Sequence, residues 1–147
     1  MNGRNRQQGG RSQQQQPKID TSKINFKDLD PELFNETAKF YAEKIASVRK
    51  GNSDRLNSPT QLRKFYDELC MWDAKVNMDE KSFQECRPFI LMLNAKAAYA
   101  NGRKPPLVDN GYVTLLGDCL NQVETAKEFR TCKVFMEAFM GFYKSVA

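Results

Sequence analysis

The chain has 147 residues, with 23 lysines and arginines against 18 aspartates and glutamates, and it contains no histidine. The length fits one domain of ordinary size, and the absence of histidine removes the commonest general base and metal ligand of enzymes. Motifs for phosphate loops, dinucleotide binding, zinc proteases and nucleophile elbows are also absent. We therefore expect a protein that is not an enzyme and that uses no cofactor and no metal.

No stretch of about eighteen apolar residues occurs, so no membrane-spanning helix is expected, and the first residues lack the apolar core of a signal peptide. The cysteines Cys70, Cys86, Cys119 and Cys132 do not have the paired spacing of a zinc site. They fit buried, reduced thiols better than metal ligands. We expect a cytoplasmic protein with no membrane partner.

Residues 1–23 are rich in Gln, Gly, Asn, Ser and basic side chains, and Ile19 is their only large apolar residue apart from Met1. Such a composition cannot bury enough apolar surface to offset the entropy lost on ordering. The sequence predicts a disordered, Gln/Arg-rich basic tail over residues 1–23 and a folded domain over residues 24–147.

The folded part begins with two helices that share a start signal. Asp30-Pro31-Glu32 has the pattern of an N-cap, a proline at the first helical position and an acid in the first turn. This helix should run to about Val48 and end at Gly51-Asn52. Ser58-Pro59 repeats the signal, and the following helix has apolar residues three and four positions apart: Leu62, Phe65, Leu69, Trp72 and Val76.

A third helix is predicted from Asp79 to about Ala100. Pro88 falls inside it, so we expect a kink or a break near Cys86. Asn101-Gly102 ends the helix, and Pro105-Pro106 prevents its continuation.

Two more helices are predicted at about residues 110–123 and 125–145. The first directs Leu115, Leu116, Cys119 and Leu120 inward. The second is apolar over a wide arc, from Phe129 to Val146, which indicates a helix that is central to the bundle or docked on another protein; we favour the central position. No strand is predicted, so the fold class is all-α, a compact bundle of about five helices.

The positive charge is clustered. The tail has a net charge of +4, which leaves +1 for the rest of the chain. From Arg49 to Lys64 the net charge is again +4, and residues 86–108 contain four basic residues and no acid. This pattern favours one positive face that binds nucleic acid. Alternatively, the two segments are solvated surfaces that point in different directions or pair with acids elsewhere.

Lys96 lies in the apolar segment FILMLNAKAAYA, which covers residues 89–100. Positions three, four and seven apart share a helix face, so Lys96 should lie on an outward stripe with Met92, Tyr99, Ala100 and Arg103. A lysine there can extend into water without any function. The neighbouring alanines, however, leave room for a nucleic-acid backbone, and Tyr99 is either a ring for a base or ribose or a core side chain.

Arg63 and Lys64 begin the second predicted helix. They can pair locally with Asp67 and Glu68, four residues further on, although base before acid is the weaker order. Such pairs would not stop a phosphate from competing for the same cations.

Three stretches resemble the small helical subunit of type III-A (Csm-type) CRISPR effector complexes: SPTQLRKFYDEL (58–69), LMLNAKAAYANGR (91–103) and FMEAFMGFYKSV (135–146). The resemblance implies a compact bundle of about five helices that is not a nuclease and that occurs in more than one copy, opposite the backbone subunits that hold the guide RNA, with the large subunit as a further partner. It also implies contacts with the guide RNA, the target RNA and their duplex, without readout of sequence. Carried over to the matching motifs, the RNA contacts fall on Arg63, Lys64, Lys96 and Arg103, and charge clustering adds Lys50, Arg55 and Lys104.

The alternative function is a helical protein-interaction module that uses its Phe/Met-rich last helix as a partner groove. Exposure of Phe135, Phe139 and Phe142 to solvent would favour this alternative.

Overall fold

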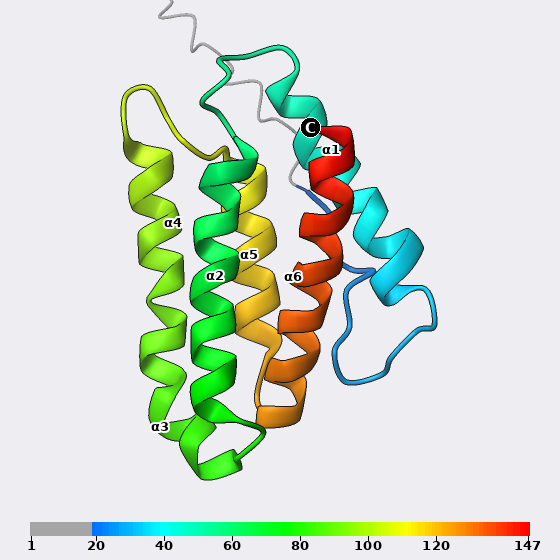
Figure 1. Cartoon of the computed structure of the whole chain (residues 1–147), viewed down its shortest axis with the longest axis vertical. Coiled ribbons are helices and arrows are strands. Elements are labelled where there is room, and N and C mark those ends of the chain that lie inside the picture. The colour runs from blue at the N-terminus through cyan, green and yellow to red at the C-terminus, as the bar shows by residue number, and fades with distance from the viewer. Residues whose placement is uncertain (1–18) are drawn as a thin grey trace, which may run out of the picture.

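The computed structural model describes residues 19–147, so most of the predicted disordered tail lies outside the described part. The described residues contain no strand. They form a π-helical turn, η1 (Leu33–Thr37), and the helices α1 (Ala38–Arg49), α2 (Pro59–Val76), α3 (Glu80–Leu91), α4 (Leu93–Gly102), α5 (Asn110–Gln122) and α6 (Ala126–Val146). In Figure 1, η1 runs into α1, and α3 and α4 follow each other as one interrupted rod beside α2. The predicted all-α bundle of about five helices is confirmed.

The last helix, α6, is central and packs against α1 and α2 (Figure 1). Its inward side chains are completely buried: Phe129, Cys132, Phe135, Met136, Phe139 and Tyr143. Because it meets neighbours on more than one side, a wide apolar arc is needed, as the sequence indicated. Phe142 and Val146, at the margin of this arc, are only partly buried.

Two of the predicted helix starts are confirmed by their caps. Ser58 Oγ accepts a hydrogen bond from the Gln61 N–H at 3.1 Å, and Asp79 Oδ1 accepts one from the Ser82 N–H at 2.8 Å. Each bond satisfies an N–H group that has no partner inside the helix.

The first helix begins later than predicted. The Asp30 carboxylate accepts a hydrogen bond from the Glu32 N–H at 2.7 Å, in a tight turn around Pro31. Helical structure starts only at Leu33, first as η1 and then as α1 from Ala38. The Asp30 carboxylate thus makes the capping bond that the start signal predicted, in the turn that leads into η1.

The third predicted helix is interrupted, but not near Cys86 as expected. α3 continues through Pro88, and the break falls at Met92, whose N–H donates to the Phe89 carbonyl at 3.2 Å. A proline removes its own N–H from the helical ladder and its ring crowds the carbonyl four residues before it, but its φ angle suits a helix. The other hydrogen bonds of α3 are sufficient to carry the helix past it.

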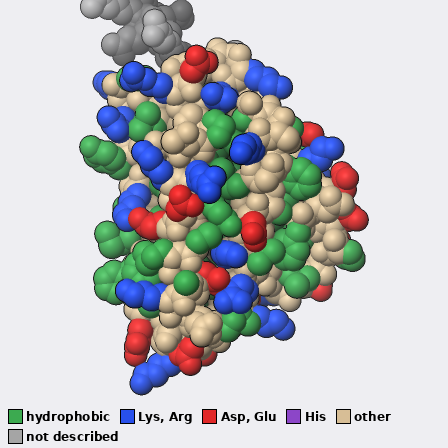
Figure 2. All heavy atoms as spheres, viewed as in Figure 1, with side chains coloured by type: hydrophobic (Ala, Val, Ile, Leu, Met, Phe, Trp, Pro, Cys, Tyr) green, Lys and Arg blue, Asp and Glu red, His purple; other side chains and the backbone are tan. Residues whose placement is uncertain are grey.

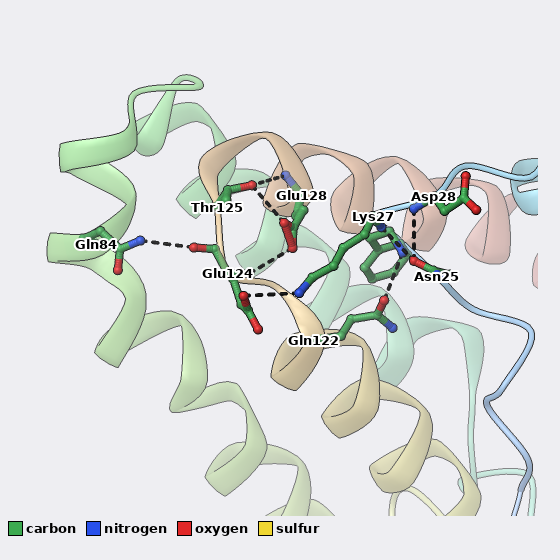
Figure 3. Close-up of polar contacts among 9 residues, drawn as sticks. Asn25, Lys27, Asp28, Gln84, Gln122, Glu124, Thr125 and Glu128 are labelled. Atoms are coloured by element: carbon green, nitrogen blue, oxygen red, sulfur yellow. Dashed lines mark hydrogen bonds and ion pairs between the residues drawn. The ribbon is translucent and has the colours of Figure 1, made fainter.

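The irregular chain before η1 is docked on the bundle by side chains near the end of α5 (Figure 3). The Gln122 side chain bonds to the backbone on both sides of Asn25. Its Oε1 accepts a hydrogen bond from the Phe26 N–H at 2.9 Å, and its Nε2 donates one to the Ile24 carbonyl at 3.2 Å. Lys27 forms an ion pair with Glu124 at 3.2 Å. Both Ile24 and Phe26 are buried, so this stretch belongs to the core.

The contacts between this N-terminal chain and the bundle begin before residue 24, the predicted start of the folded domain. The Tyr41 hydroxyl donates to the Asp20 carbonyl at 2.6 Å, and the Thr21 hydroxyl donates to Asp118 Oδ2 at 2.6 Å. We refer to residues 19–28 as the N-terminal segment.

Asn57 ties the loop between α1 and α2 to the loop between α4 and α5. Its N–H donates to the Leu107 carbonyl at 2.9 Å, and its side chain exchanges hydrogen bonds with Asp109 at 3.0 and 2.9 Å. Its carbonyl accepts a hydrogen bond from the Tyr143 hydroxyl of α6. These bonds hold the start of α2 beside the end of α4.

None of the described helices is long and apolar enough to cross a membrane. The four cysteines are free thiols. Burial raises the pKa of Cys132 to about 12 and also raises the pKa of Cys119, whereas Cys70 and Cys86 are only partly buried.

Candidate nucleic-acid interface

A shallow groove of about 240 Å³ lies between α2 and α4. α2 contributes positions three and four apart on one helix face, and α4 with the loop after it forms the other side. The lining residues are Gln61, Lys64, Phe65 and Glu68 from α2, and Leu93, Lys96, Tyr99, Ala100, Arg103 and Leu107 from the other side. The groove thus brings together cations from the two basic segments of the sequence.

The floor of the groove is apolar and its rim is polar. Phe65, Leu93 and Ala100 are buried and belong to the core. Lys64 and Arg103 are exposed at the rim, where their cations remain hydrated and accessible to an anion.

Lys96 lies on an outward face of α4, as predicted. Its side chain is 52% exposed, and the flanking Met92 and Tyr99 are exposed as well. The prediction was wrong for Ala100, which was placed on the outward stripe but is buried.

Glu68 neutralises Lys96 across the groove. Glu68 Oε1 accepts a hydrogen bond from Lys96 Nζ at 2.5 Å. The alternative local pair of Lys64 with Glu68 is therefore not formed, and Lys64 makes no ion pair within residues 19–147. Sequence reasoning missed this role of Glu68, because the two partners are far apart in the chain and meet only when the bundle brings α2 and α4 to the two sides of the groove.

Arg63 does form its predicted local pair, with Asp67 at 3.8 Å. It does not line the groove, since it lies on a neighbouring face of α2. An exposed pair of this kind contributes little to stability, so the guanidinium remains available.

The other predicted cations, Lys50, Arg55 and Lys104, are exposed in the two loops that Asn57 joins. Both loops lie at the same end of the bundle as the start of α2 and the end of α4 (Figure 1). None of the three lines the groove. Figure 2 shows lysines and arginines over α2 and α4 with acidic side chains among them, so the positive face is mixed with acids.

The last helix does not expose the phenylalanine side chains that would favour a partner groove. Phe135 and Phe139 are completely buried, and Phe142 is partly buried. The large exposed apolar side chains lie elsewhere, including Met71, Phe89 and Met92.

The fold and the groove define a small all-α protein with a cation-lined groove between two helices and no group of three or more potential metal ligands in residues 19–147. The family model for Csm2 Type III-A matches residues 32–147, and the chain belongs to this family. It is a small subunit of type III-A CRISPR complexes, which contain other Cas subunits. No curated protein and no solved structure matches the chain.

Proposed function

We propose that the protein is a non-catalytic, RNA-binding small subunit of a type III-A CRISPR interference complex. In this proposal, Lys64, Lys96 and Arg103 bind backbone phosphates of the target RNA and of its duplex with the guide RNA. The observation that carries the proposal is that one groove is lined by cations from two helices. Its partners are the guide and target RNA, the backbone and large subunits, and further copies of itself, in the cytoplasm.

The chemistry of the groove supports contact without sequence readout. Lysine and arginine bind phosphate through charge and hydrogen bonds that do not depend on the base. In a guide-directed complex, base pairing supplies the specificity, and the protein recognises backbone and shape. A subunit of this kind needs accessible cations at defined positions and no reacting groups.

Arg63, Lys50, Arg55 and Lys104 are assigned to a second set of contacts. They lie at the same end of the bundle as the groove but outside it. We expect each to contribute less than a groove cation, because an extended backbone must leave the groove to reach them.

The test is a triple charge reversal in the full chain, Lys64→Glu, Lys96→Glu and Arg103→Glu. If each cation binds one phosphate of a single strand, the slope of log affinity against log salt is about −2, and the variant should lose this slope together with most of its affinity. The matched control reverses the exposed Lys39, Lys81 and Lys127, which lie outside the groove. The control variant has the same net charge as the groove variant, so the general electrostatic attraction to RNA is the same in both.

Fluorescence anisotropy with labelled RNA measures both variants, and circular dichroism establishes that they are folded. Equal affinity of the folded groove variant and the control would contradict the proposal. The same pair of variants in the assembled complex reports whether target RNA is retained there.

A further inference from the structure

Tyr99 has a different environment from the buried tyrosines. Its side chain is 74% exposed, whereas Tyr41, Tyr112 and Tyr143 are completely buried. Within residues 19–147, Tyr99 takes part in no aromatic pair. The fold therefore does not use the ring of Tyr99, and a large apolar surface is left in contact with water.

The ring lies between two cations. Lys96 precedes Tyr99 by three residues on α4, so the two share one side of the helix, and Arg103 follows Tyr99 by four as the first residue beyond the helix end at Gly102. A helix rises about 1.5 Å per residue, which places Lys96 roughly 5 Å along the axis before the ring, and Arg103 lies beyond the ring, just after the helix end. All three residues line the groove, and Lys64 faces them from α2.

The groove also offers contacts suited to a base. Its floor of Phe65, Leu93 and Ala100 is apolar and buried. Gln61 lies at the rim and is partly exposed, and its amide can both donate and accept hydrogen bonds. A base that enters meets an aromatic face, an apolar floor and an amide, while the phosphates on either side of it meet the cations.

Only an unpaired nucleotide can use this combination. In an A-form duplex the faces of the bases are covered by their neighbours, and the protein contacts phosphates and 2′-hydroxyls. An unpaired base exposes its face and stacks on aromatic side chains, independently of its identity. We propose that Tyr99 stacks against one unpaired base of an RNA strand, whose flanking phosphates are bound by Lys96 and Arg103. The inference rests on the proposed function, because it uses the same groove.

The experiment compares a short single-stranded RNA that contains one 2-aminopurine with the same strand in a blunt duplex, both bound by the full chain. Stacking on a ring quenches 2-aminopurine fluorescence. Tyr99→Ala should weaken single-strand binding about ten-fold and abolish the quench, while duplex binding stays unchanged. Tyr99→Phe retains the aromatic face and should behave as the wild type.

Phe89→Ala is the matched control. Phe89 is 55% exposed on the same interrupted rod, but it does not line the groove. Its replacement should leave both the affinity and the quench unchanged.

Three results would overturn the inference. The first is Tyr99→Ala binding the single strand as tightly as the wild type, with the quench intact. The second is equal weakening of single strand and duplex. The third is intact RNA binding with loss of assembly into the complex, which would assign Tyr99 to a protein contact. If the triple charge reversal weakens RNA binding but Tyr99→Ala does not, only this inference fails; if the triple reversal has no effect, the proposed function fails.

Discussion

Glu68 places a negative charge in a groove whose other charged groups are cations. It is only 28% exposed and is held against Lys96. An RNA phosphate that binds Lys96 must displace this carboxylate or accept its repulsion. The acid therefore limits how tightly the groove binds an anion.

Glu68→Gln should strengthen RNA binding by about three- to ten-fold at low salt, because it frees Lys96 and removes the repulsion. Anisotropy titrations measure the change. The control is Glu137→Gln, which removes an exposed acid paired with Lys133 on α6, outside the groove. A weaker complex for Glu68→Gln would mean that the carboxylate positions Lys96 for the phosphate.

Asn57 combines complete burial with a left-handed backbone, at φ 53°. Asn57→Ala removes the hydrogen bonds with Asp109 and leaves a β-carbon at positive φ, so we expect a loss of about 2–4 kcal/mol in the free energy of unfolding. Asn57→Gly relieves the backbone and should be about 1 kcal/mol more stable than the alanine variant. Urea unfolding followed by circular dichroism measures both.

Asn77, at the C-cap of α2, is the control for this pair. It also has positive φ, at 47°, but it is exposed. Its alanine variant should lose only about 1 kcal/mol and its glycine variant almost nothing. Equal losses at the two asparagines would show that the hydrogen bonds of Asn57 do not stabilise the loops.

At the scale of the elements, the N-terminal segment contributes to the core in a way that its sequence does not indicate. It has no regular structure and precedes the family match, which begins at Glu32, yet Ile24 and Phe26 are buried in the bundle. Two truncations isolate its contribution, one that removes residues 1–18 and one that removes residues 1–28.

The longer truncation should unfold at least about 2 kcal/mol more easily than the shorter one, because each of the two apolar side chains contributes roughly 1.5–3 kcal/mol on burial and the entropy regained by the freed chain offsets only part of this. Thermal and urea unfolding provide the comparison. Phe26→Ala in the full chain should reproduce part of the loss. Equal stability of the two truncations would show that the docking contributes nothing net.

The helix starts at Ser58 and Asp79 were predicted correctly because their signals are local. The Ser58 and Asp79 caps bond to groups three residues away, and such contacts do not depend on the rest of the fold. The break was predicted near Cys86 and not at Met92, where it occurs. The prediction failed because a proline does not necessarily end a helix that packs well on its neighbours. Ile90 and Leu93, on either side of the break, are both buried.

At the scale of the whole molecule, the absence of histidine predicts an unusual pH profile. The unfolding free energy should vary little between about pH 5.5 and 7.5, where histidine would titrate. Backbone hydrogen bonds from Ser82 and Ala126 lower the pKa values of Asp79 and Glu80. A carboxyl group whose pKa is lower in the folded state stabilises the protein above its unfolded pKa, and this stabilisation is lost as the pH falls through the folded pKa.

The melting temperature should therefore be flat near neutrality and should fall below about pH 4.5. Differential scanning fluorimetry from acid to neutral pH measures the profile. Asp79→Asn keeps a capping side chain without the charge. It should therefore reduce the fall of the melting temperature at acid pH. A step between pH 6 and 7 would contradict the prediction.

The sequence by itself determined the helical class, most helix boundaries, the central place of the last helix and the outward position of Lys96. These features follow from apolar periodicity and from capping residues, which act over a few positions. The two basic segments are likewise visible in the order of charged residues along the chain.

Only the tertiary structure decided which charged groups meet. Lys64 and Arg103 share a groove because the bundle sets α2 and α4 on its two sides, and the same arrangement pairs Lys96 with Glu68 and leaves Arg63 on another face. Charges act through space over several ångströms, so their effect depends on distances between segments that are remote along the chain. Local sequence patterns do not contain those distances, and the close packing of the core sets them.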